Sequence, residues 1–258
     1  MKKKIRSLIP KNIKDFIWRY FLNYFFNSIN RYKNTYGITK NVNLNDYGNQ
    51  QRYLFFESAR YYLQVNRISG VYAEFGSFGG NTFRMSLNTL GLYGKPNNID
   101  HFYSFDSFKG MPEPEGIDKQ KIWRVGMNSI GEENFLKMMK KDKKRISTIK
   151  GFFEQSLKVF KFPCNTKIAL AYVDCDYYSS TKTVLEFLTS YLSHGMILAF
   201  DDWDCYFADN KRGQRKAFYE WSKKINKNYS FEIFRVMGSG GKSFIVHEKK
   251  KIGLSFEG

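Results

Sequence analysis

Two pairs of aspartates each follow a short apolar run in the second half of this sequence: Asp174 and Asp176 come after residues 168–173, and Asp201 and Asp202 come after residues 196–200. Both runs have the length and composition of buried parallel strands. Carboxylate oxygens are the ligands that hard divalent cations such as Mg²⁺ prefer. Acidic residues after a strand also serve as helix N-caps or solvated turn residues. Two clusters at successive strand ends nevertheless favour a metal or polar-ligand site.

The segment between these two runs predicts a helix. Ser179 or Ser180 offers an N-cap and Gly195 a stop, and apolar residues recur at helical spacing at Val184, Leu185, Leu188 and Leu192. A strand–helix–strand connection makes the two strands parallel neighbours, so their carboxyl ends lie at one edge of a sheet. Ligands of open α/β sheets bind at that edge. The sequence therefore predicts that three or four of these carboxylates converge there.

A glycine-rich turn follows an earlier apolar run, residues 71–75. Gly76, Gly79 and Gly80 lead from this strand into a helix that extends to about Leu90. Glycine lets the backbone approach a ligand closely, and the free N–H groups of a helix N-terminus attract an anion. Taken alone, the turn is a weak signal that dinucleotide-binding folds share.

The next predicted strand, residues 101–105, also ends at an acid, Asp106. A carboxylate at that position can accept hydrogen bonds from ribose hydroxyls. The loop that follows, residues 108–116, reads Phe-Lys-Gly-Met-Pro-Glu-Pro-Glu-Gly. Its prolines and glycines predict a segment that wraps the site and stays outside the core.

The rest of the chain predicts further alternation of helices and strands. We expect a strand at residues 146–149, and helices near 51–67, 131–142, 154–160 and 211–226. The inward face of the first helix is expected to carry Tyr53, Leu54, Ser58, Tyr61 and Tyr62. Two final strands, 231–236 and 242–247, are joined by Met-Gly-Ser-Gly-Gly and therefore form an antiparallel hairpin. This gives seven strands of an α/β fold, with no sign of a repeat or a second such domain.

The composition is that of a globular and strongly basic protein, with 42% hydrophobic residues and a formal charge of +18. Such a charge fits nucleic acid, an anionic membrane or an acidic substrate as partner. The abundance of Lys, Asn, Ile, Phe and Tyr explains it equally well as compositional drift of AT-rich coding sequence. Three cysteines without metal-ligand spacing indicate a reducing compartment. No run of 18 apolar residues is present, and we expect a cytoplasmic protein.

The N-terminal 50 residues carry none of these motifs and form a separate predicted region before the catalytic domain at 51–258. Residues 1–30 combine basic residues with aromatic ones at helical spacing. We expect an amphipathic helix that packs on the body or on a second subunit, which favours a homo-oligomer. A peripheral contact with the inner face of the membrane is the alternative. Residues 31–50 are rich in asparagine and predict a loop or lid.

Four stretches together resemble the macrocin O-methyltransferase family, metal-dependent members of the class I S-adenosylmethionine-dependent methyltransferases. They are A-E-F-G-S-F-G-G-N-T (73–82), F-D-S-F-K-G-M-P-E-P-E (105–115), V-D-C-D-Y-Y-S-S-T (173–181) and I-L-A-F-D-D-W (197–203). The second and third are fairly specific, and the resemblance covers residues 70–246. It implies a Rossmann-like, seven-stranded fold with a C-terminal antiparallel hairpin. It also implies methyl transfer to a sugar hydroxyl of a glycan, nucleotide-sugar or glycosylated metabolite, with S-adenosylmethionine and Mg²⁺ as cofactors.

The resemblance also assigns roles to residues. The cation would be held by Asp174, Asp201 and Asp202. The cofactor would contact Glu74, Gly76, Ser77, Phe78, Gly80, Thr82, Asp106, Ser107, Gly151, Phe152 and Asp174. Asp176 would act through water or bind the acceptor. Related catechol-type enzymes carry a lysine three residues after the first metal aspartate, where this chain has Tyr177. The general base is therefore open, and Asp174 is our choice.

Three other functions compete with this one. A nicotinamide-dependent oxidoreductase would share the glycine-rich turn, but it needs no Asp201-Asp202 pair and no terminal hairpin. A nucleic-acid methyltransferase fits the charge, yet Asp-Cys-Asp-Tyr replaces the Asn/Asp-Pro-Pro-aromatic motif of amino-group methylators. A non-catalytic glycan- or membrane-binding module would have no use for the intact acidic residues. The acceptor itself is not identified by the sequence.

Overall fold

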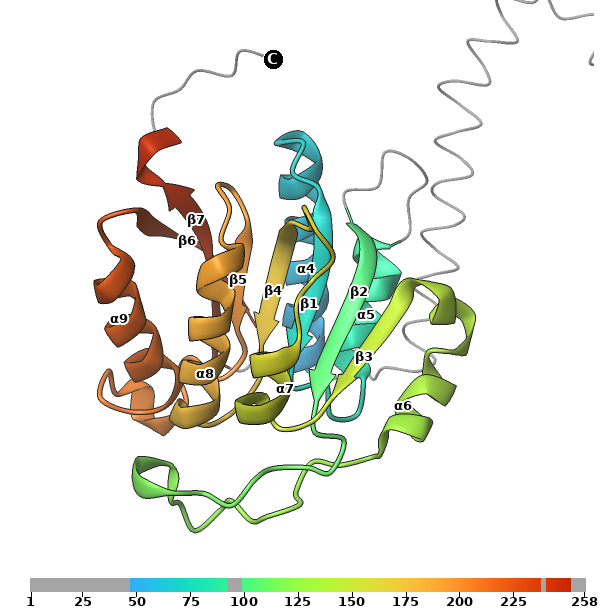
Figure 1. Cartoon of the computed structure of the whole chain (residues 1–258), viewed down its shortest axis with the longest axis vertical. Helices are drawn as coiled ribbons and strands as arrows, with labels where there is room; N and C mark the ends of the chain where they lie inside the picture. The colour runs from blue at the N-terminus through green and yellow to red at the C-terminus, as the bar shows by residue number, and fades with distance from the viewer. Residues whose placement is uncertain (1–46, 92–98, 238–239, 252–258) are drawn as a thin grey trace, which may run out of the picture. The chain divides into compact units, whose positions relative to one another are not determined.

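A single mixed sheet of seven strands forms the centre of the computed structural model, which describes residues 47–91, 99–237 and 240–251 (Figure 1). The strand order is β3-β2-β1-β4-β5-β7-β6, with the first five parallel and β7 antiparallel to both of its neighbours. The strands are β1 (Gly70–Phe75), β2 (Ile99–Asp106), β3 (Ile146–Lys150), β4 (Ile168–Val173), β5 (Ile197–Phe200), β6 (Tyr229–Met237) and β7 (Gly241–Glu248). The predicted α/β class and terminal hairpin are confirmed.

The strand order reverses between β1 and β4, because β1 connects onward to β2 on one side while β4 connects to β5 on the other. Such a reversal opens a crevice at the carboxyl ends of the two strands, where ligands of α/β proteins bind. The strands β4 and β5 are buried along their whole length, as their continuous apolar runs predict. The crevice therefore lies over the best-packed part of the sheet.

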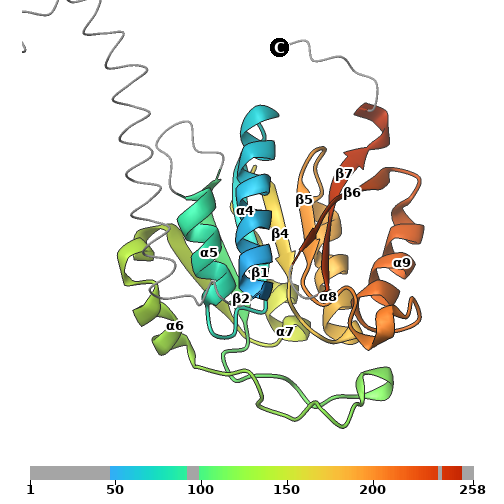
Figure 2. The same ribbon diagram turned by 180° about the vertical axis from the view of Figure 1, so that it is seen from behind.

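Helices cover both faces of the sheet and give three layers (Figures 1 and 2). One face carries α4 (Tyr47–Val65) and α5 (Asn81–Leu90), and the other carries α7 (Phe153–Val159), α8 (Tyr178–Leu188) and α9 (Gly213–Ile225). Aromatic residues fill the layer between sheet and helix, as in the pair of Phe56 and Tyr172, whose ring centroids are 5.6 Å apart. The short α6 (Glu132–Met138) packs beside α5 through the Phe135 and Phe83 rings.

The helix α4 differs from its prediction in start and in orientation. It begins at Tyr47, so residues 47–50 form its first turn and are not part of a loop. Its buried face carries Phe55, Phe56, Ala59 and Leu63. Leu54 and Tyr61, which were expected to face inward, are 54% and 66% exposed. The prediction chose a stripe one residue out of register, because aromatic residues occur on several sides of this helix.

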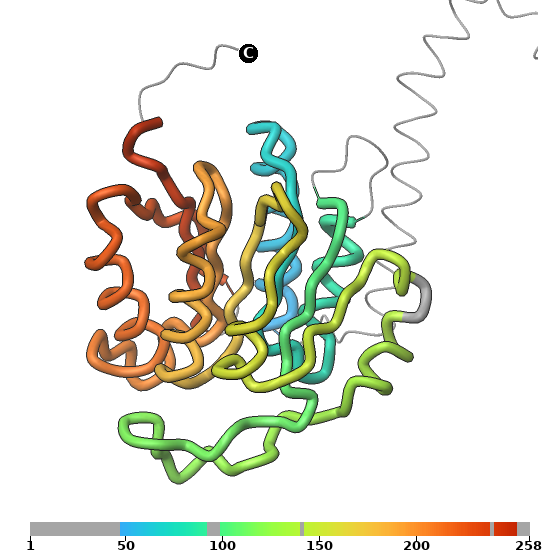
Figure 3. Tube along the Cα trace, in the orientation of Figure 1, coloured from blue at the N-terminus to red at the C-terminus, as the bar shows by residue number. Residues whose placement is uncertain are grey.

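A long loop, residues 107–131, connects β2 to α6 and runs past the carboxyl ends of the strands (Figure 3). It contains one short 3-10 turn, Gly116–Asp118. This confirms the prediction that residues 108–116 wrap the site. The helix expected at 131–142 is shorter, since α6 ends at Met138 and a 3-10 segment, Lys140–Arg145, leads into β3.

The predictions for residues 1–46, including the amphipathic helix at 1–30, lie outside the described residues. Within the described ranges, none of the helices has both the length and the apolar character needed to span a bilayer. The boundary between the N-terminal region and the catalytic domain stays a prediction.

Candidate active site

A pocket of about 240 Å³ lies at the carboxyl ends of β1 and β4, where the strand order predicts a crevice. The loop 107–131 supplies one wall and α4 contributes Arg52. The lining residues are Arg52, Gly76, Phe78, Asp106, Ser107, Gly110, Met111, Pro112, Asn128, Gly151, Phe152, Phe153, Glu154, Asp174, Cys175, Asp176, Ser180 and Asp201. Eight of the residues predicted to bind cofactor or cation are among them.

The glycine-rich turn approaches β4 so closely that only glycine fits at its first position. Gly76 has a φ of 90°, and a Cβ there would overlap the carbonyl oxygen of Asp174. Its N–H donates to the carbonyl of Phe105 at 2.8 Å, which ties the turn to the end of β2 as well. Backbone, and no side chain, therefore forms this side of the pocket, as close approach to a ligand requires.

Asp106 holds the same turn from the neighbouring strand. Its carboxylate accepts hydrogen bonds from the N–H groups of Ser77 (2.7 Å), Phe78 (3.0 Å) and Phe108 (2.6 Å). Its carbonyl oxygen accepts from the N–H of Gly151 at 3.0 Å. Asp106 therefore joins the glycine-rich turn, the loop 107–131 and the segment after β3. It is 8% exposed, and it still lines the pocket.

Four predicted cofactor residues lie outside the pocket wall: Glu74, Ser77, Gly80 and Thr82. The Ser77 hydroxyl accepts from the Ser104 hydroxyl at 2.8 Å, and a Cβ on Gly80 would lie 2.7 Å from the Met139 side chain. Both residues thus pack the turn against the body of the protein, and Thr82 lies in the first turn of α5.

Glu74 is fully buried beneath the turn. Its Oε2 accepts from the Tyr72 hydroxyl, while its Oε1 has no hydrogen-bond partner among the described residues. Burial raises the pKa of this carboxyl to about 8, and Tyr72 opposes that shift. Glu74 therefore lies beneath the turn and outside the pocket wall, with one carboxylate oxygen unpaired among the described residues.

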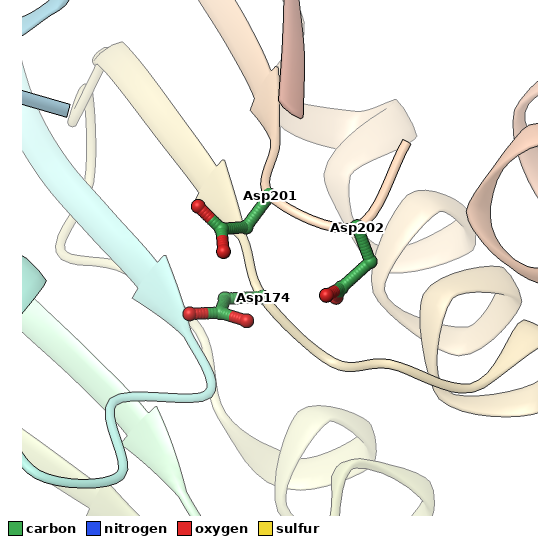
Figure 4. Close-up of side chains that lie close together, drawn as sticks. All are labelled: Asp174, Asp201 and Asp202. Atoms are coloured by element: carbon green, nitrogen blue, oxygen red, sulfur yellow. The ribbon is translucent and has the colours of Figure 1, made fainter. Parts of the chain in front are cut away.

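The predicted cation ligands are brought together by the ends of β4 and β5. One carboxylate oxygen each from Asp174, Asp201 and Asp202 lies within 4.8 Å of the others (Figure 4). The buried side chain of Gln214 fixes this arrangement, because it accepts from the N–H of Asp202 and donates to the carbonyl of Val173, both at 3.0 Å. Gln214 lies on α9, and no local pattern in the sequence pointed to it.

These carboxylates disfavour one another's charge. Burial raises the pKa values of Asp174 and Asp202 well above the ordinary range, and neighbouring aspartates raise them further. Burial and Asp201 raise the pKa of Asp176 to about 6. Asp176 lines the pocket, and its N–H donates to Oδ2 of Asp202 at 3.0 Å. A cation at this position would relieve the repulsion.

Arg52 is a site residue that the sequence analysis missed. Its Nε donates to Oδ1 of Asp201 at 2.9 Å and its Nη2 to Oδ2 at 2.6 Å. The hydroxyl of Tyr172 also donates to Oδ1. The two partners are 149 positions apart, so no spacing rule connects them. A basic residue in an otherwise neutral first half of α4, Tyr-Gly-Asn-Gln-Gln-Arg, was the only available signal.

The predicted serine N-cap of α8 is wrong. The N-cap residue is Tyr177, and no side chain of the neighbouring sequence caps it. Asp118 from the loop 107–131 takes this role, since its two carboxylate oxygens accept from the N–H groups of Tyr178 (2.7 Å) and Ser179 (3.1 Å). Ser180 lines the pocket instead.

A second contact holds the same loop over the site. The indole N–H of Trp123 donates to the Tyr206 hydroxyl at 3.2 Å, and that hydroxyl donates to the carbonyl of Asp176 at 3.2 Å. The ring of Trp123 also packs edge-on against Tyr177. The loop is therefore attached to the segments after both β4 and β5.

Comparison with known proteins identifies the family. The family model for Macrocin-O-methyltransferase (TylF) matches residues 47–228, which include all three aspartates and Arg52. This chain belongs to the macrocin O-methyltransferase family. It is an S-adenosylmethionine-dependent O-methyltransferase, as the four sequence stretches predict.

Solved structures agree in fold. The O-methyltransferase NovP is 18% identical, with a TM-score of 0.58 over 76% of this chain and 79% of that chain. CalS11, a calicheamicin methyltransferase, is 21% identical, with a TM-score of 0.58 over 75% and 77%. An apo structure of CalS11, described as TDP-rhamnose 3′-O-methyltransferase, is 22% identical, with a TM-score of 0.51 over 75% and 78%. No curated protein has a sequence that matches this chain.

Proposed function

We propose that this enzyme transfers the methyl group of S-adenosylmethionine to a sugar hydroxyl and requires a divalent cation to do so. The observation that carries the proposal is the group of three carboxylates, Asp174, Asp201 and Asp202, whose oxygens lie within 4.8 Å beside the cofactor pocket. A methyltransferase that needed no cation would have little reason to hold three mutually repelling acids so close together next to its methyl donor.

The pocket fits S-adenosylmethionine on chemical grounds. Met111, Phe152 and Phe153 offer apolar surface of the kind that an adenine ring packs against. A carboxylate has about four acceptor positions, and Asp106 has three occupied, so one is left for a ribose hydroxyl. Glu74 lies below the glycine-rich turn with Oε1 open. These residues would hold the adenine, ribose and methionine parts in that order.

The acidic cluster fits Mg²⁺ or a similar hard cation. Its donors are all carboxylate oxygens, which suit Mg²⁺, Mn²⁺ and Ca²⁺ better than Zn²⁺. A cation bound there supplies a positive charge that lowers the pKa of an acceptor hydroxyl. The guanidinium of Arg52 already provides one positive charge at Asp201, which supports the view that this position favours cations.

Asp174 is the residue we propose as general base. Its carboxylate accepts no hydrogen bond from the described residues and faces the pocket. Burial is the largest cause of its raised pKa, so it accepts a proton more readily than an exposed aspartate does. Asp176, also in the pocket wall, would bind a hydroxyl of the acceptor.

A sugar acceptor is supported by the family and by the description of CalS11 as a TDP-rhamnose methyltransferase. A sugar ring offers vicinal hydroxyls. Two adjacent hydroxyl oxygens would fill ligand positions of the cation that the three carboxylates leave free.

The test is transfer of a labelled methyl group to nucleotide-sugars and glycan extracts, with and without EDTA. We expect chelation to stop transfer and added Mg²⁺ or Mn²⁺ to restore it. Binding of S-adenosylhomocysteine should persist in EDTA, because the cation contacts the acceptor. Full activity in EDTA would refute the metal requirement and leave the methyltransferase assignment in place.

For residues 1–30 we propose subunit packing in a cytoplasmic homo-oligomer. Deletion of residues 2–30 should then change the sedimentation coefficient while S-adenosylhomocysteine still binds. Unchanged sedimentation, together with lost binding to anionic liposomes, would favour the membrane contact instead.

A further inference from the structure

The ion pair between Arg52 and Asp201 is the most constrained contact of the acidic cluster. Arg52 reaches both oxygens of the Asp201 carboxylate, at 2.9 Å through Nε and at 2.6 Å through Nη2. The side chains are 20% and 8% exposed, so solvent has little access to the pair. A bidentate fork of this kind fixes the plane of a carboxylate as well as its position.

Counting acceptor positions shows what Asp201 has left to offer. Its Oδ1 accepts from Arg52 Nε and from the Tyr172 hydroxyl, which occupies both lone pairs of that oxygen. Among the described residues, its Oδ2 accepts only from Arg52 Nη2. One lone pair on Oδ2 is therefore the single unoccupied position of this carboxylate.

The other two acids are held much less tightly. Asp202 accepts one backbone N–H, that of Asp176, and has Cys205 Sγ 3.9 Å away. The carboxylate of Asp174 accepts no hydrogen bond from the described residues. Neither has a basic partner among the ion pairs of the described residues. Only Asp201 is fixed in orientation before any cation binds.

We propose that Arg52 is a positioning residue, which orients Asp201 as a ligand through one Oδ2 lone pair. This inference rests on the proposed cation requirement. Partners that orient ligating carboxylates commonly contribute 10–100-fold to metal affinity. Asp201 then contributes one oxygen at a fixed place, and the carboxylates of Asp174 and Asp202, which have fewer hydrogen bonds, adjust to the cation. In this role Arg52 acts on the cation through the carboxylate of Asp201.

The alternative role for Arg52 is that of a counter-charge that merely balances the empty cluster. The two roles predict different effects of the substitution Arg52→Lys on cation affinity. Lysine keeps the positive charge and lacks the planar fork, so it cannot hold both oxygens of Asp201 at once. Arg52→Lys therefore separates orientation from charge.

The experiment is titration of the full-length protein with Mn²⁺ in the presence of S-adenosylhomocysteine, with free Mn²⁺ measured by electron paramagnetic resonance. We expect Arg52→Lys and Arg52→Gln each to weaken Mn²⁺ binding by about tenfold or more. Tyr172→Phe, which frees one lone pair of Oδ1 and keeps the fork, should have a smaller effect. Arg60→Lys is the matched control, since Arg60 lies on the same helix and pairs with Glu57.

Far-ultraviolet circular dichroism reports whether each variant is folded, and we expect the spectra of all variants to match that of the unaltered protein. Unaltered Mn²⁺ affinity in Arg52→Lys, with tighter binding in Arg52→Gln, would overturn the positioning role and make Arg52 a counter-charge. Equal losses in Arg52→Lys and Arg60→Lys would also overturn it, because the effect would then belong to the helix. Absence of Mn²⁺ binding by the unaltered protein would refute the cation requirement itself, which distinguishes the two failures.

Discussion

Two groups of carboxylates lie at the same edge of the sheet, and the protein pairs them in opposite ways. Asp106 accepts three backbone N–H groups, from Ser77, Phe78 and Phe108. Asp174, two strands away in the sheet, faces other acids and accepts no hydrogen bond from the described residues. The hydrogen bonds of the first carboxylate are therefore supplied by the protein, and they hold the glycine-rich turn and the loop 107–131 in place. The second is left for something outside the chain, which is what a cation site requires.

The largest effect should come from removing a charge at the cluster. Asp174→Asn keeps the shape of the side chain and removes both a ligand and the proposed base, so we expect methyl transfer to fall by about 10²–10⁴-fold. S-adenosylhomocysteine should bind with nearly normal affinity in isothermal titration. Retained transfer would show that Asp174 is neither ligand nor base.

The same substitution at Asp106 should act on stability. The amide group that it introduces would place a donor against backbone N–H groups, so Asp106→Asn should lose about 2–3 kcal/mol and lower Tm by about 4–12 °C. Metal-free Asp174→Asn should instead raise Tm, because it removes a repelling charge. Thermal denaturation in EDTA measures the change in Tm of both variants. A change in the same direction for Asp106→Asn and Asp174→Asn would contradict the comparison.

The pH dependence of stability should follow from the acids whose pKa values are raised, which are the acidic cluster and Glu74, with a pKa raised to about 8. The folded-state pKa of Asp176 is raised to about 6, and those of Asp174 and Asp202 are raised further by burial and by neighbouring acids. The folded protein therefore binds more protons than the unfolded chain above about pH 4, and its stability falls as pH rises. We expect Tm in EDTA to drop from pH 5 to pH 8, and Mg²⁺ to raise Tm most at pH 8. A flat profile in EDTA would mean that the acids are not buried together.

The smallest effect should come from Asp118, a second carboxylate that the protein satisfies with backbone N–H groups. Asp118→Ala removes the cap of α8 and should lower stability by about 1 kcal/mol. Ser179→Ala is the control, because the serine was expected to cap the helix and does not. A larger loss of stability for Ser179→Ala than for Asp118→Ala in chemical denaturation would show that the serine caps α8.

Local patterns in the sequence were sufficient for the sheet and for most of the site. The strand at 168–173 was predicted residue for residue, because continuous apolar runs between turn residues have few other structures. The convergence of Asp174, Asp201 and Asp202 followed from parallel connection alone. Both inferences need only neighbours in sequence and the rules of strand order.

Contacts across long sequence separations were not predictable in this way. Arg52 meets Asp201 from another layer of the fold, and Asp118 caps a helix 60 residues further on. Each depends on where an entire segment packs, which no local spacing encodes. The α4 register failed for a related reason, since Leu54 and Phe55 are equally apolar and only the shape of the sheet selects Phe55.

The cap formed by Asp118 also gives the protein a built-in reporter. A helix capped by its own neighbours protects its first amides as soon as the helix forms. In α8 the amides of Tyr178 and Ser179 donate to a residue on the loop 107–131. Their hydrogen-exchange rates therefore depend on whether that loop is docked, as well as on the helix itself. Exchange at these two positions, measured with and without cofactor or acceptor, follows the movement of the pocket wall without any label or mutation.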